Sequence, residues 1–176
     1  MTHTYRTTLS VPNGVPITIP KYIVSNGGHI RKAEVEDVPY LSKNLRPEDK
    51  DEIKAASGMT PEGGIGWAVL MKEAWVGVHK EGPWVIWGHM SADPEVATVW
   101  CLATTQLSKH RAGFFRVSIS WLDRIGQQFK YLNCFTDSRN EEHHRWLKFM
   151  RFKRVGDPLF FFDPNVEFHE YRRKDA

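Results

Sequence analysis

The 176-residue sequence predicts a mixed α/β fold in a single domain, and three observations point to it. Short apolar runs alternate with segments whose apolar residues recur every three or four positions, as in amphipathic helices. Two strand-like runs flank Lys80-Glu81-Gly82-Pro83, which is a hairpin signal. The stretch 96–136 has the order strand, helix, strand, and such crossovers are right-handed, so its two strands are expected to be parallel neighbours.

The first third of the domain is predicted to hold one strand and three helices. A strand at 29–33 is followed by a helix at 34–45, in which apolar residues share one face. A more polar helix at 47–57 is closed by Gly58, because glycine favours helix C-termini. Thr60-Pro61-Glu62 begins the third helix, since proline is favoured at the first helical position.

The middle of the chain is predicted to be mainly β. Strands at 74–79 and 84–90 form the hairpin, and Ser91–Glu95 makes a turn. The run 96–104 is almost continuously apolar, which indicates a strand buried on both faces. A short basic loop then leads into an amphipathic helix from about 114 to 129.

The C-terminal part is predicted to contain one helix among strands. A strand at 131–135 precedes a helix that begins at Asn140. Three further strands are expected at 152–155, 159–162 and 166–172, separated by Gly-Asp-Pro and Asp-Pro-Asn turns. Residues 29–176 thus form the domain, preceded by an N-terminal arm at 1–28 that is rich in Pro, Gly, Thr and Asn.

The overall composition narrows the classes of function. The formal net charge is only +3, from 24 basic and 21 acidic residues, which is too small an excess to indicate nucleic-acid binding. Two cysteines form neither a disulfide framework nor a metal-binding pattern, and a reducing compartment is expected. No stretch approaches the roughly 20 apolar residues of a membrane span.

The basic loop Ser108–Gly113 is the most specific local feature. It places Lys109, His110 and Arg111 where a helix begins, and cations at that electropositive end are disfavoured by about 0.3–1 kcal/mol each. We therefore expect an anion to meet the loop. A coenzyme phosphate, a carboxylate of a partner protein and nucleic acid are the alternatives.

Cysteine and histidine pairs have simpler explanations. Cys101 and Cys134 fall in apolar strands, where an inert core thiol is expected. His143 and His144 are neighbours on a helix, so their side chains diverge and cannot chelate one metal ion well. No metal site is predicted.

The tryptophans beside the hairpin and the carboxylates near the expected cleft are two further sets of candidate side chains. Trp84 and Trp87, beside the hairpin, are the best candidates for an exposed interaction patch. Asp93, Glu95 and Asp137 are the carboxylates nearest the expected cleft, but Asp137 also starts an Asp-Ser-Arg-Asn turn that would explain it. No catalytic residue is assigned.

Three segments resemble the Gcn5-related N-acetyltransferase (GNAT) family. They are "HIRKAEVEDVPYL" (29–41), "LSKHRAGFFRVS" (107–118) at the pyrophosphate-loop position, and "NEEHHRWLKFMRF" (140–152). Two longer stretches, "WCLATTQLSKHRAGFFRVSISWLDRI" (100–125) and "LNCFTDSRNEEHHRWLKFMRF" (132–152), are most similar to the acetyltransferase-like internal virion proteins of podovirus phages. The resemblance implies a mostly antiparallel sheet with a central splayed parallel strand pair and helices on both faces. It also implies acetyl-CoA as a possible cofactor, held by Leu107, Lys109, His110, Arg111, Ala112, Gly113 and Asn140.

Three departures from the family pattern bear on function. Arg111 replaces a glycine that lets backbone N–H groups approach a phosphate, Leu147 replaces a tyrosine acid, and Arg151 replaces a glycine. We therefore expect an eroded acetyl-CoA site, no required cofactor, and a protein-binding module that acts in a virion or in the host cytoplasm. The alternative is an active acetyl-CoA-dependent N-acetyltransferase of unknown acceptor. A protein partner is expected, and nucleic acid is not.

Overall fold

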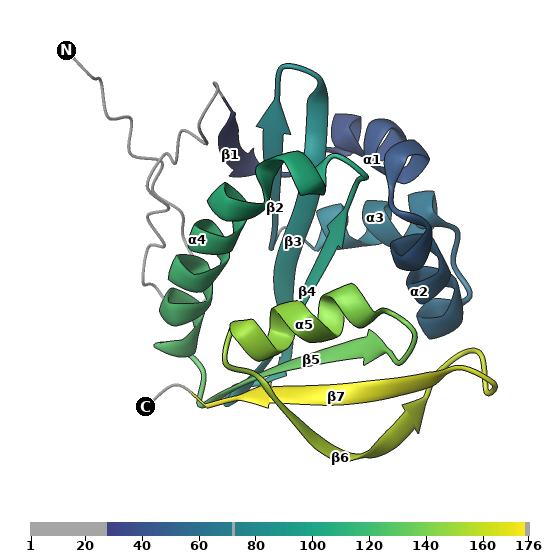
Figure 1. Ribbon diagram of the computed structural model, residues 1–176, viewed down its shortest axis with the longest axis vertical. Coiled ribbons are helices and arrows are strands. Elements are labelled where there is room, and N and C mark those ends of the chain that lie inside the picture. The colour runs from purple at the N-terminus through teal and green to yellow at the C-terminus, as the bar shows by residue number, and fades with distance from the viewer. Residues whose placement is uncertain (1–27, 72, 175–176) are drawn as a thin grey trace.

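Figure 1 shows the computed structural model, which describes residues 28–71 and 73–174 and contains a seven-stranded sheet in the order β1-β2-β3-β4-β5-β7-β6. The strands are β1 (His29–Lys32), β2 (Ala74–His79), β3 (Gly82–Asp93), β4 (Val96–Ala103), β5 (Tyr131–Asp137), β6 (Lys153–Phe160) and β7 (Glu167–Arg173). Neighbouring strands are antiparallel except β4 and β5. Apart from Gly28, the expected N-terminal arm lies outside the described residues.

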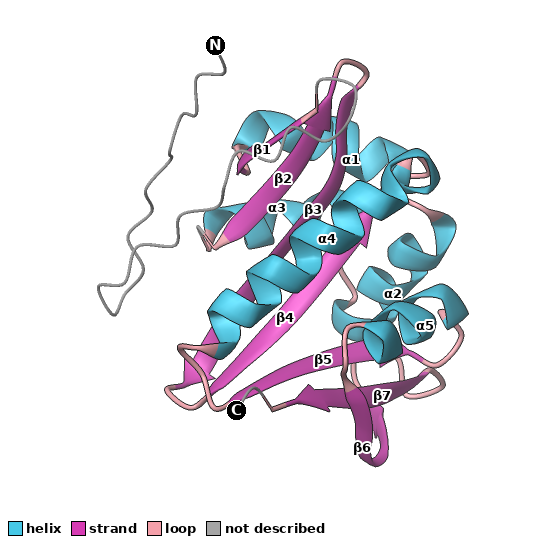
Figure 2. Cartoon of the chain, turned by 60° about the vertical axis from the view of Figure 1, so that its left-hand side comes forward, coloured by secondary structure: helices cyan, strands magenta, loops and turns pink. Residues whose placement is uncertain are grey.

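Helices cover both faces of the sheet (Figure 2). They are the 3-10 helix η1 (Val35–Asp37), α1 (Val38–Asn44), α2 (Pro47–Ser57), α3 (Pro61–Leu70), α4 (Leu107–Gly126) and α5 (Glu141–Phe149). Val85 and Trp87 pack in the core under α4 and α5, whereas Ile86 between them packs with α1, α2 and α3. This alternation is the one a strand buried on both faces requires.

Local chemistry explains the boundaries of the first helices, which were predicted correctly. Gly58 closes α2 with φ 71°, a left-handed conformation that glycine adopts without steric cost. Pro61 begins α3, and the Thr60 hydroxyl accepts a hydrogen bond from the N–H of Gly63 at 3.1 Å.

The parallel pair opens into a wedge, as predicted. β4 and β5 are paired from Val96 and Tyr131 to Thr98 and Asn133, and then they part. The sequence led us to expect the divergence near Leu107 and Asn133; the Asn133 position is confirmed, whereas Leu107 is the first residue of α4 and lies outside both strands.

Helix α4 begins at Leu107 and not near 114, which corrects the prediction of a basic loop. The segment Ser108–Gly113 forms the first turns of the helix. At the N-cap, the Gln106 side chain donates to the Tyr40 hydroxyl at 3.0 Å instead of capping the helix. Because the N-cap residue is Gln106 and not Ser, Thr, Asp or Asn, the sequence carries no cap signal where α4 begins.

Two strands are longer than predicted. β6 is a single strand across the Gly-Asp-Pro segment, because a bulge between Val155 and Leu159 absorbs these residues without ending the pairing with β7. Gly156 supplies the φ of 68° that the bulge needs. β3 continues to Asp93 and so includes residues expected in a turn.

The proposed exposed patch at Trp84 and Trp87 is wrong. Their exposed fractions are 1% and 2%, and both rings lie edge-on to Phe114 of α4. The hairpin strands lie inside the sheet, so their large side chains are covered by α4. Core packing is the commoner use of tryptophan and holds here.

Helix α5 ends in a Schellman motif. The N–H of Phe152 donates to the carbonyl of Leu147 at 2.9 Å, and the N–H of Arg151 donates to that of Lys148 at 3.1 Å. Phe152 and Leu147 also share the main core. Arg151 has φ 68°, at the position where glycine is usually found.

Candidate functional site

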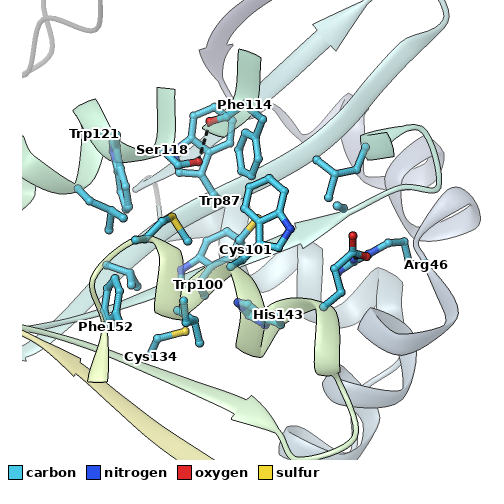
Figure 3. A pocket seen from close by; sticks show the side chains of 18 residues that line it. Arg46, Trp87, Trp100, Cys101, Phe114, Ser118, Trp121, Cys134, His143 and Phe152 are labelled. Atoms are coloured by element: carbon cyan, nitrogen blue, oxygen red, sulfur yellow. Dashed lines mark hydrogen bonds and ion pairs between the residues drawn. The ribbon is translucent and has the colours of Figure 1, made fainter. Parts of the chain in front are cut away.

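The wedge between β4 and β5 holds a small apolar cavity of about 60 Å³ (Figure 3). Its walls come from β3, β4, β5, α4 and α5, and they include Trp87, Cys101, Trp121, Cys134, His143 and Leu147. Pockets that hold drug-sized ligands measure about 300–1,000 Å³. A coenzyme arm therefore does not fit in this cavity as it stands.

The chain itself supplies the anions for the basic helix start. Lys109 Nζ lies 3.5 Å from Glu81 Oε2, and the Arg111 guanidinium forms an ion pair with the Glu142 carboxylate of α5. The side chains of Lys109 and Arg111 are 64% and 57% exposed, so each pair contributes at most about 1 kcal/mol. No external anion is needed to explain these cations.

Glu142 also joins α5 to α2. Its Oε2 accepts a hydrogen bond from Arg46 Nη1 at 2.6 Å, while Arg46 Nη2 lies 2.7 Å from Asp49 Oδ1. Asp49 is 1% exposed, and its Oδ2 accepts the backbone N–H of Ala103 on β4 at 2.7 Å. Arg111, Glu142, Arg46 and Asp49 thus form a chain of charges that links three helices around the cavity and occupies a backbone donor of β4.

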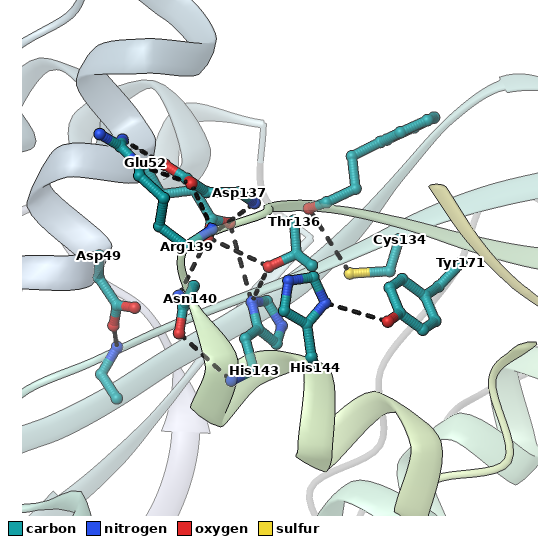
Figure 4. A network of polar contacts seen from close by, with 12 residues as sticks. Asp49, Glu52, Cys134, Thr136, Asp137, Arg139, Asn140, His143, His144 and Tyr171 are labelled. Atoms are coloured by element: carbon teal, nitrogen blue, oxygen red, sulfur yellow. Dashed lines mark hydrogen bonds and ion pairs between the residues drawn. The ribbon is translucent and has the colours of Figure 1, made fainter. Parts of the chain in front are cut away.

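A second polar network joins α2, β5 and α5 (Figure 4). Glu52 Oε2 accepts hydrogen bonds from Thr136 Oγ1 at 3.2 Å and Asn140 Nδ2 at 3.1 Å, and Thr136 Oγ1 lies 2.8 Å from His143 Nδ1. Burial raises the pKa of Glu52, but hydrogen bonds from His143 and Asn140 bring it below its ordinary value. Burial lowers the pKa of His143, but hydrogen bonds to Cys134 and Glu52 hold it well above its ordinary value.

The remaining residues expected at a cofactor site are only partly brought together. Leu107 is buried against the cavity, and the His110 ring stacks on Trp84 with centroids 4.8 Å apart. Ala112 lines an outer groove, and Gly113 lies within α4. Asn140 is 2% exposed and caps α5, as its Oδ1 accepts the N–H of His143 at 3.2 Å. That these residues bind a coenzyme stays a prediction.

An outer groove of about 750 Å³ runs between α4 and α5. Arg111, Arg116 and Arg145 line it together with Phe115, Trp146 and Phe149. The Phe115 and Phe149 rings meet edge to face, with their centroids 4.1 Å apart, and Phe149 is 68% exposed. Glu142 and Trp146 line both the groove and the inner cavity, so they form the wall between the two.

The candidate carboxylates of the cleft have structural partners. Asp137 is 2% exposed and accepts a hydrogen bond from Arg139 Nη2 at 2.5 Å. Burial raises the pKa of Asp137, but Arg139 brings it below its ordinary value. Glu95 pairs with Lys130 at 3.2 Å, and Asp93 Oδ1 accepts the N–H of Glu95 at 2.7 Å.

Among residues 28–71 and 73–174, no group of three or more His, Cys, Asp or Glu side chains is arranged to hold a metal ion. No helix in the same described ranges is both long and apolar enough to cross a membrane.

Sequence reasoning missed Arg46, Asp49 and Glu52, which α2 brings to the cavity region. Arg46 and Glu142 are 96 positions apart, so no local spacing connects them. Glu142 lies in the first turn of α5, where an acidic residue is favoured on its own account. The one available signal for these residues was the high density of charged side chains in Arg46–Glu52. A helix must pack one face on the sheet, so some of these charges had to be buried.

No protein-family model and no curated protein matches the chain. Its fold resembles that of a GNAT-family acetyltransferase from Bacillus cereus, with 12% identity, 85% of this chain and 98% of that chain covered, and a TM-score of 0.56. It also resembles an N-acetyltransferase from Staphylococcus aureus (14% identity, coverage 84% and 98%, TM-score 0.57). A third neighbour is the ribosomal-protein-S5-alanine acetyltransferase from Vibrio fischeri (12% identity, coverage 84% and 92%, TM-score 0.58).

At these identities the likeness shows the fold alone, and that fold is the GNAT acetyltransferase fold. The predicted fold class is confirmed, including the single parallel pair β4–β5 and the helices on both faces. Acetyltransferases with this fold use acetyl-CoA as their co-substrate.

Proposed function

We propose that this GNAT-fold chain has an eroded acetyl-CoA site and works as a protein-binding module, associated with a phage virion or directed at a host protein. The observation that carries the proposal is the double use of Glu142. Its carboxylate engages both Arg111, a cation expected to hold the coenzyme phosphates, and Arg46 beside the cavity. The virion or the host cytoplasm as its location rests on the sequence resemblance alone.

Four observations support the loss of coenzyme binding. The cavity of about 60 Å³ is several-fold smaller than a ligand pocket, and Asp49 already occupies the N–H of Ala103. Helix α4 begins before the basic residues, so Arg111 lies in a regular helix and not in a glycine-lined cradle. Leu147, 2% exposed, offers no proton where the family has a tyrosine. The residues present do not fit acetyl-CoA.

The surface for a partner is the outer groove between α4 and α5. Three arginines form its rim against one carboxylate, and three aromatic side chains form its apolar part. Arginine and aromatic residues are the usual anchors of protein interfaces. The chemistry fits an acidic, amphipathic segment of another protein, laid into the groove as a helix.

Calorimetry with acetyl-CoA and with desulfo-coenzyme A tests the first half of the proposal. We expect dissociation constants weaker than about 100 μM, roughly −5.5 kcal/mol, for the full chain. Glu142→Ala is the informative variant, because it frees both arginines. A gain of binding in this variant alone would identify Glu142 as the obstruction. Tight binding and amine acetylation by the wild type would refute the eroded site.

Fluorescence anisotropy tests the second half with a labelled helical peptide that carries Leu and Phe at i, i+4 spacing and Glu elsewhere. We expect binding that Arg116→Glu and Arg145→Glu weaken at least tenfold, while Arg124→Glu, on the same helix as Arg116 but outside the groove lining, leaves it unchanged. The matched control peptide has Lys in place of Glu. Equal binding of both peptides would contradict the groove as an acid-selective surface, and preferential binding of single-stranded DNA would favour a nucleic-acid partner.

An active N-acetyltransferase of unknown acceptor is the second candidate. The specific observation in its favour is the wedge itself, since β4 and β5 part beyond Thr98 and Asn133 and leave a cavity at that point. The calorimetry above separates the two functions.

A further inference from the structure

A pocket of about 330 Å³ lies between α5 and the strands β6 and β7. Its volume is at the lower end of the range for ligand pockets, which is about 300–1,000 Å³. Its lining differs from that of the inner cavity, because it consists mainly of ionisable side chains. We call it the basic pocket, since Arg145 and Lys148 of α5 and Arg154 of β6 all line it.

The three cations of the basic pocket are poorly neutralised by the chain itself. In the part of the chain that the structure describes, neither Arg145 nor Lys148 has an ion-pair partner. Arg154 Nη2 reaches Glu167 Oε1 only at 4.0 Å, and the same oxygen accepts a hydrogen bond from His169 Nε2 at 2.9 Å. Like charges gathered on neighbouring positions are unfavourable, so the pocket suits an anion.

A buried hydroxyl group also lines the basic pocket. Tyr171 is 3% exposed, and its hydroxyl oxygen lies 3.0 Å from His144 Nδ1 (Figure 4). His144 Nε2 lies 3.2 Å from the carbonyl oxygen of Ser138, which can only accept, so Nε2 carries a proton. In the neutral ring Nδ1 is therefore an acceptor, and the Tyr171 O–H donates to it. The hydroxyl proton is then turned away from any ligand in the pocket.

Protonation of His144 reverses this hydrogen bond. The new N–H at Nδ1 must be donated, and the Tyr171 oxygen can accept it because a hydroxyl both donates and accepts. The Tyr171 O–H is then free to donate to an acceptor in the pocket. An anion there would stabilise the charged ring and would bind the hydroxyl that the ring releases. Anion binding and proton uptake at His144 therefore strengthen each other, as linkage requires.

The groups around His144 keep its ring neutral unless an anion is beside it. Burial lowers the pKa of His144, and the charges of two neighbouring histidines lower it further, while the Ser138 carbonyl opposes them. Besides Tyr171 and the three cations, the titratable groups that face the ring come from α5, β5 and β7. They are His143 and Glu141, Asp137, and His169.

We propose that the basic pocket binds a phosphate group in its dianionic form, held by its three cations and the Tyr171 hydroxyl, and that His144 takes up one proton from solvent on binding. Arginine binds phosphate through parallel N–H bonds, and lysine binds it as a point charge. The three cations and Glu141 together leave two positive charges, which a dianion neutralises. Among the described residues, only Arg145 lines both this pocket and the outer groove. Phosphate binding here goes beyond the protein-binding function and does not depend on it.

Sulfate is the first probe, because it stays a dianion across the range in which histidine titrates. NMR of the imidazole C–H signals of the full chain, at constant ionic strength, gives both the affinity and the titration of His144, with His144→Gln assigning the signal. We expect saturable binding that weakens at least tenfold from about pH 5 to about pH 8, and a pKa of His144 that rises on saturation. Tyr171→Phe should weaken binding more at the lower pH. Affinity independent of pH would overturn the proposal.

Single substitutions test the cations. Lys148→Ala and Arg154→Ala should each weaken sulfate binding at least fivefold. The matched control is Lys153→Ala, next to Arg154 on β6 but outside the pocket lining, which should leave binding unchanged. Equal losses from Arg154→Ala and Lys153→Ala would indicate unspecific attraction to a basic surface and would overturn the proposal. Arg116→Glu lies in the outer groove alone, so it should leave sulfate binding unchanged whether or not the groove binds a partner.

Two phosphorylated probes distinguish the sources of the phosphate group. They are O-phosphoserine and the helical peptide of the anisotropy assay with one phosphoserine added. Tighter binding of the phosphorylated peptide than of the plain peptide, with the gain lost in Lys148→Ala, would support the site and assign the phosphate to a partner protein. Binding of O-phosphoserine without such a gain would support the site and assign it to a small phosphorylated molecule. Binding of neither probe would overturn the proposal.

Discussion

Replacing Arg151 with glycine should stabilise the protein. Arg151 holds φ 68° at the end of α5, where a left-handed conformation costs an L-residue about 1–2 kcal/mol. Glycine avoids that cost but loses about 0.5–1 kcal/mol through the greater freedom of the unfolded chain. The difference is a net gain of about 0.5–1 kcal/mol for Arg151→Gly.

Urea denaturation measures this gain. We expect a higher midpoint with an unchanged m-value, which is the mark of a change in stability alone. For a domain of this size the gain corresponds to a rise of about 2 °C in Tm. The Schellman hydrogen bonds from Arg151 and Phe152 are made by backbone groups, so the substitution leaves them in place.

Arg151→Ala is the matched control, because alanine removes the side chain and keeps the steric cost of the left-handed backbone. It should stay within about 0.5 kcal/mol of the wild type, as surface substitutions usually do. Equal midpoints for the glycine and alanine variants would refute the reasoning, since the left-handed backbone would then cost no more than the freedom that glycine adds to the unfolded chain.

Three further predictions concern α4, its ion pairs and the buried histidine. Trp121→Ala should cost roughly 3–5 kcal/mol in unfolding free energy and Ser120→Ala less than about 0.5 kcal/mol, and equal denaturation midpoints would mean that the buried face is misassigned. Lys109→Ala combined with Arg111→Ala removes two exposed ion pairs, so circular dichroism should show a native fold and denaturation a change of at most about 2 kcal/mol, whereas a larger loss would contradict a surface role. The pKa of His143 is raised on folding, so its stabilisation is complete below its unfolded pKa of about 6.5 and is lost as the pH rises through the folded value. The stability advantage of the wild type over His143→Gln should therefore shrink as the pH rises above about 6.5, and a constant advantage would show that His143 is uncharged in the fold.

Most of the fold could be predicted because its signals are local. The caps at Gly58, Thr60 and Asn140 and the period of apolar residues in α4 are each readable within a few positions. The start of α4 could not, because Gln106 binds Tyr40, a residue 66 positions away, and no local cap marks the helix. Trp84 was predicted to be exposed and is buried, because its exposure depends on which helix crosses the strand.

The candidate site could be predicted only in part. The basic residues at the helix start were found, but their anions Glu81 and Glu142 come from other elements. The polar network of Glu52, Thr136 and His143 includes a hydrogen bond between a helix residue and a strand residue that are 84 positions apart. Cys134 was expected to be inert, and an apolar strand sequence does indicate that. Only the tertiary structure shows that Cys134 and His143 line the same cavity.

The free edge of the outermost strand β6 affects how readily the protein aggregates at high concentration. An exposed sheet edge is a template on which another chain can add a strand, the first step of aggregation. Pro158 has no N–H to offer such a chain, and the bulge at Gly156 breaks the regular row of donors and acceptors on either side. Many copies packed together would therefore be protected at this edge from unwanted cross-β growth.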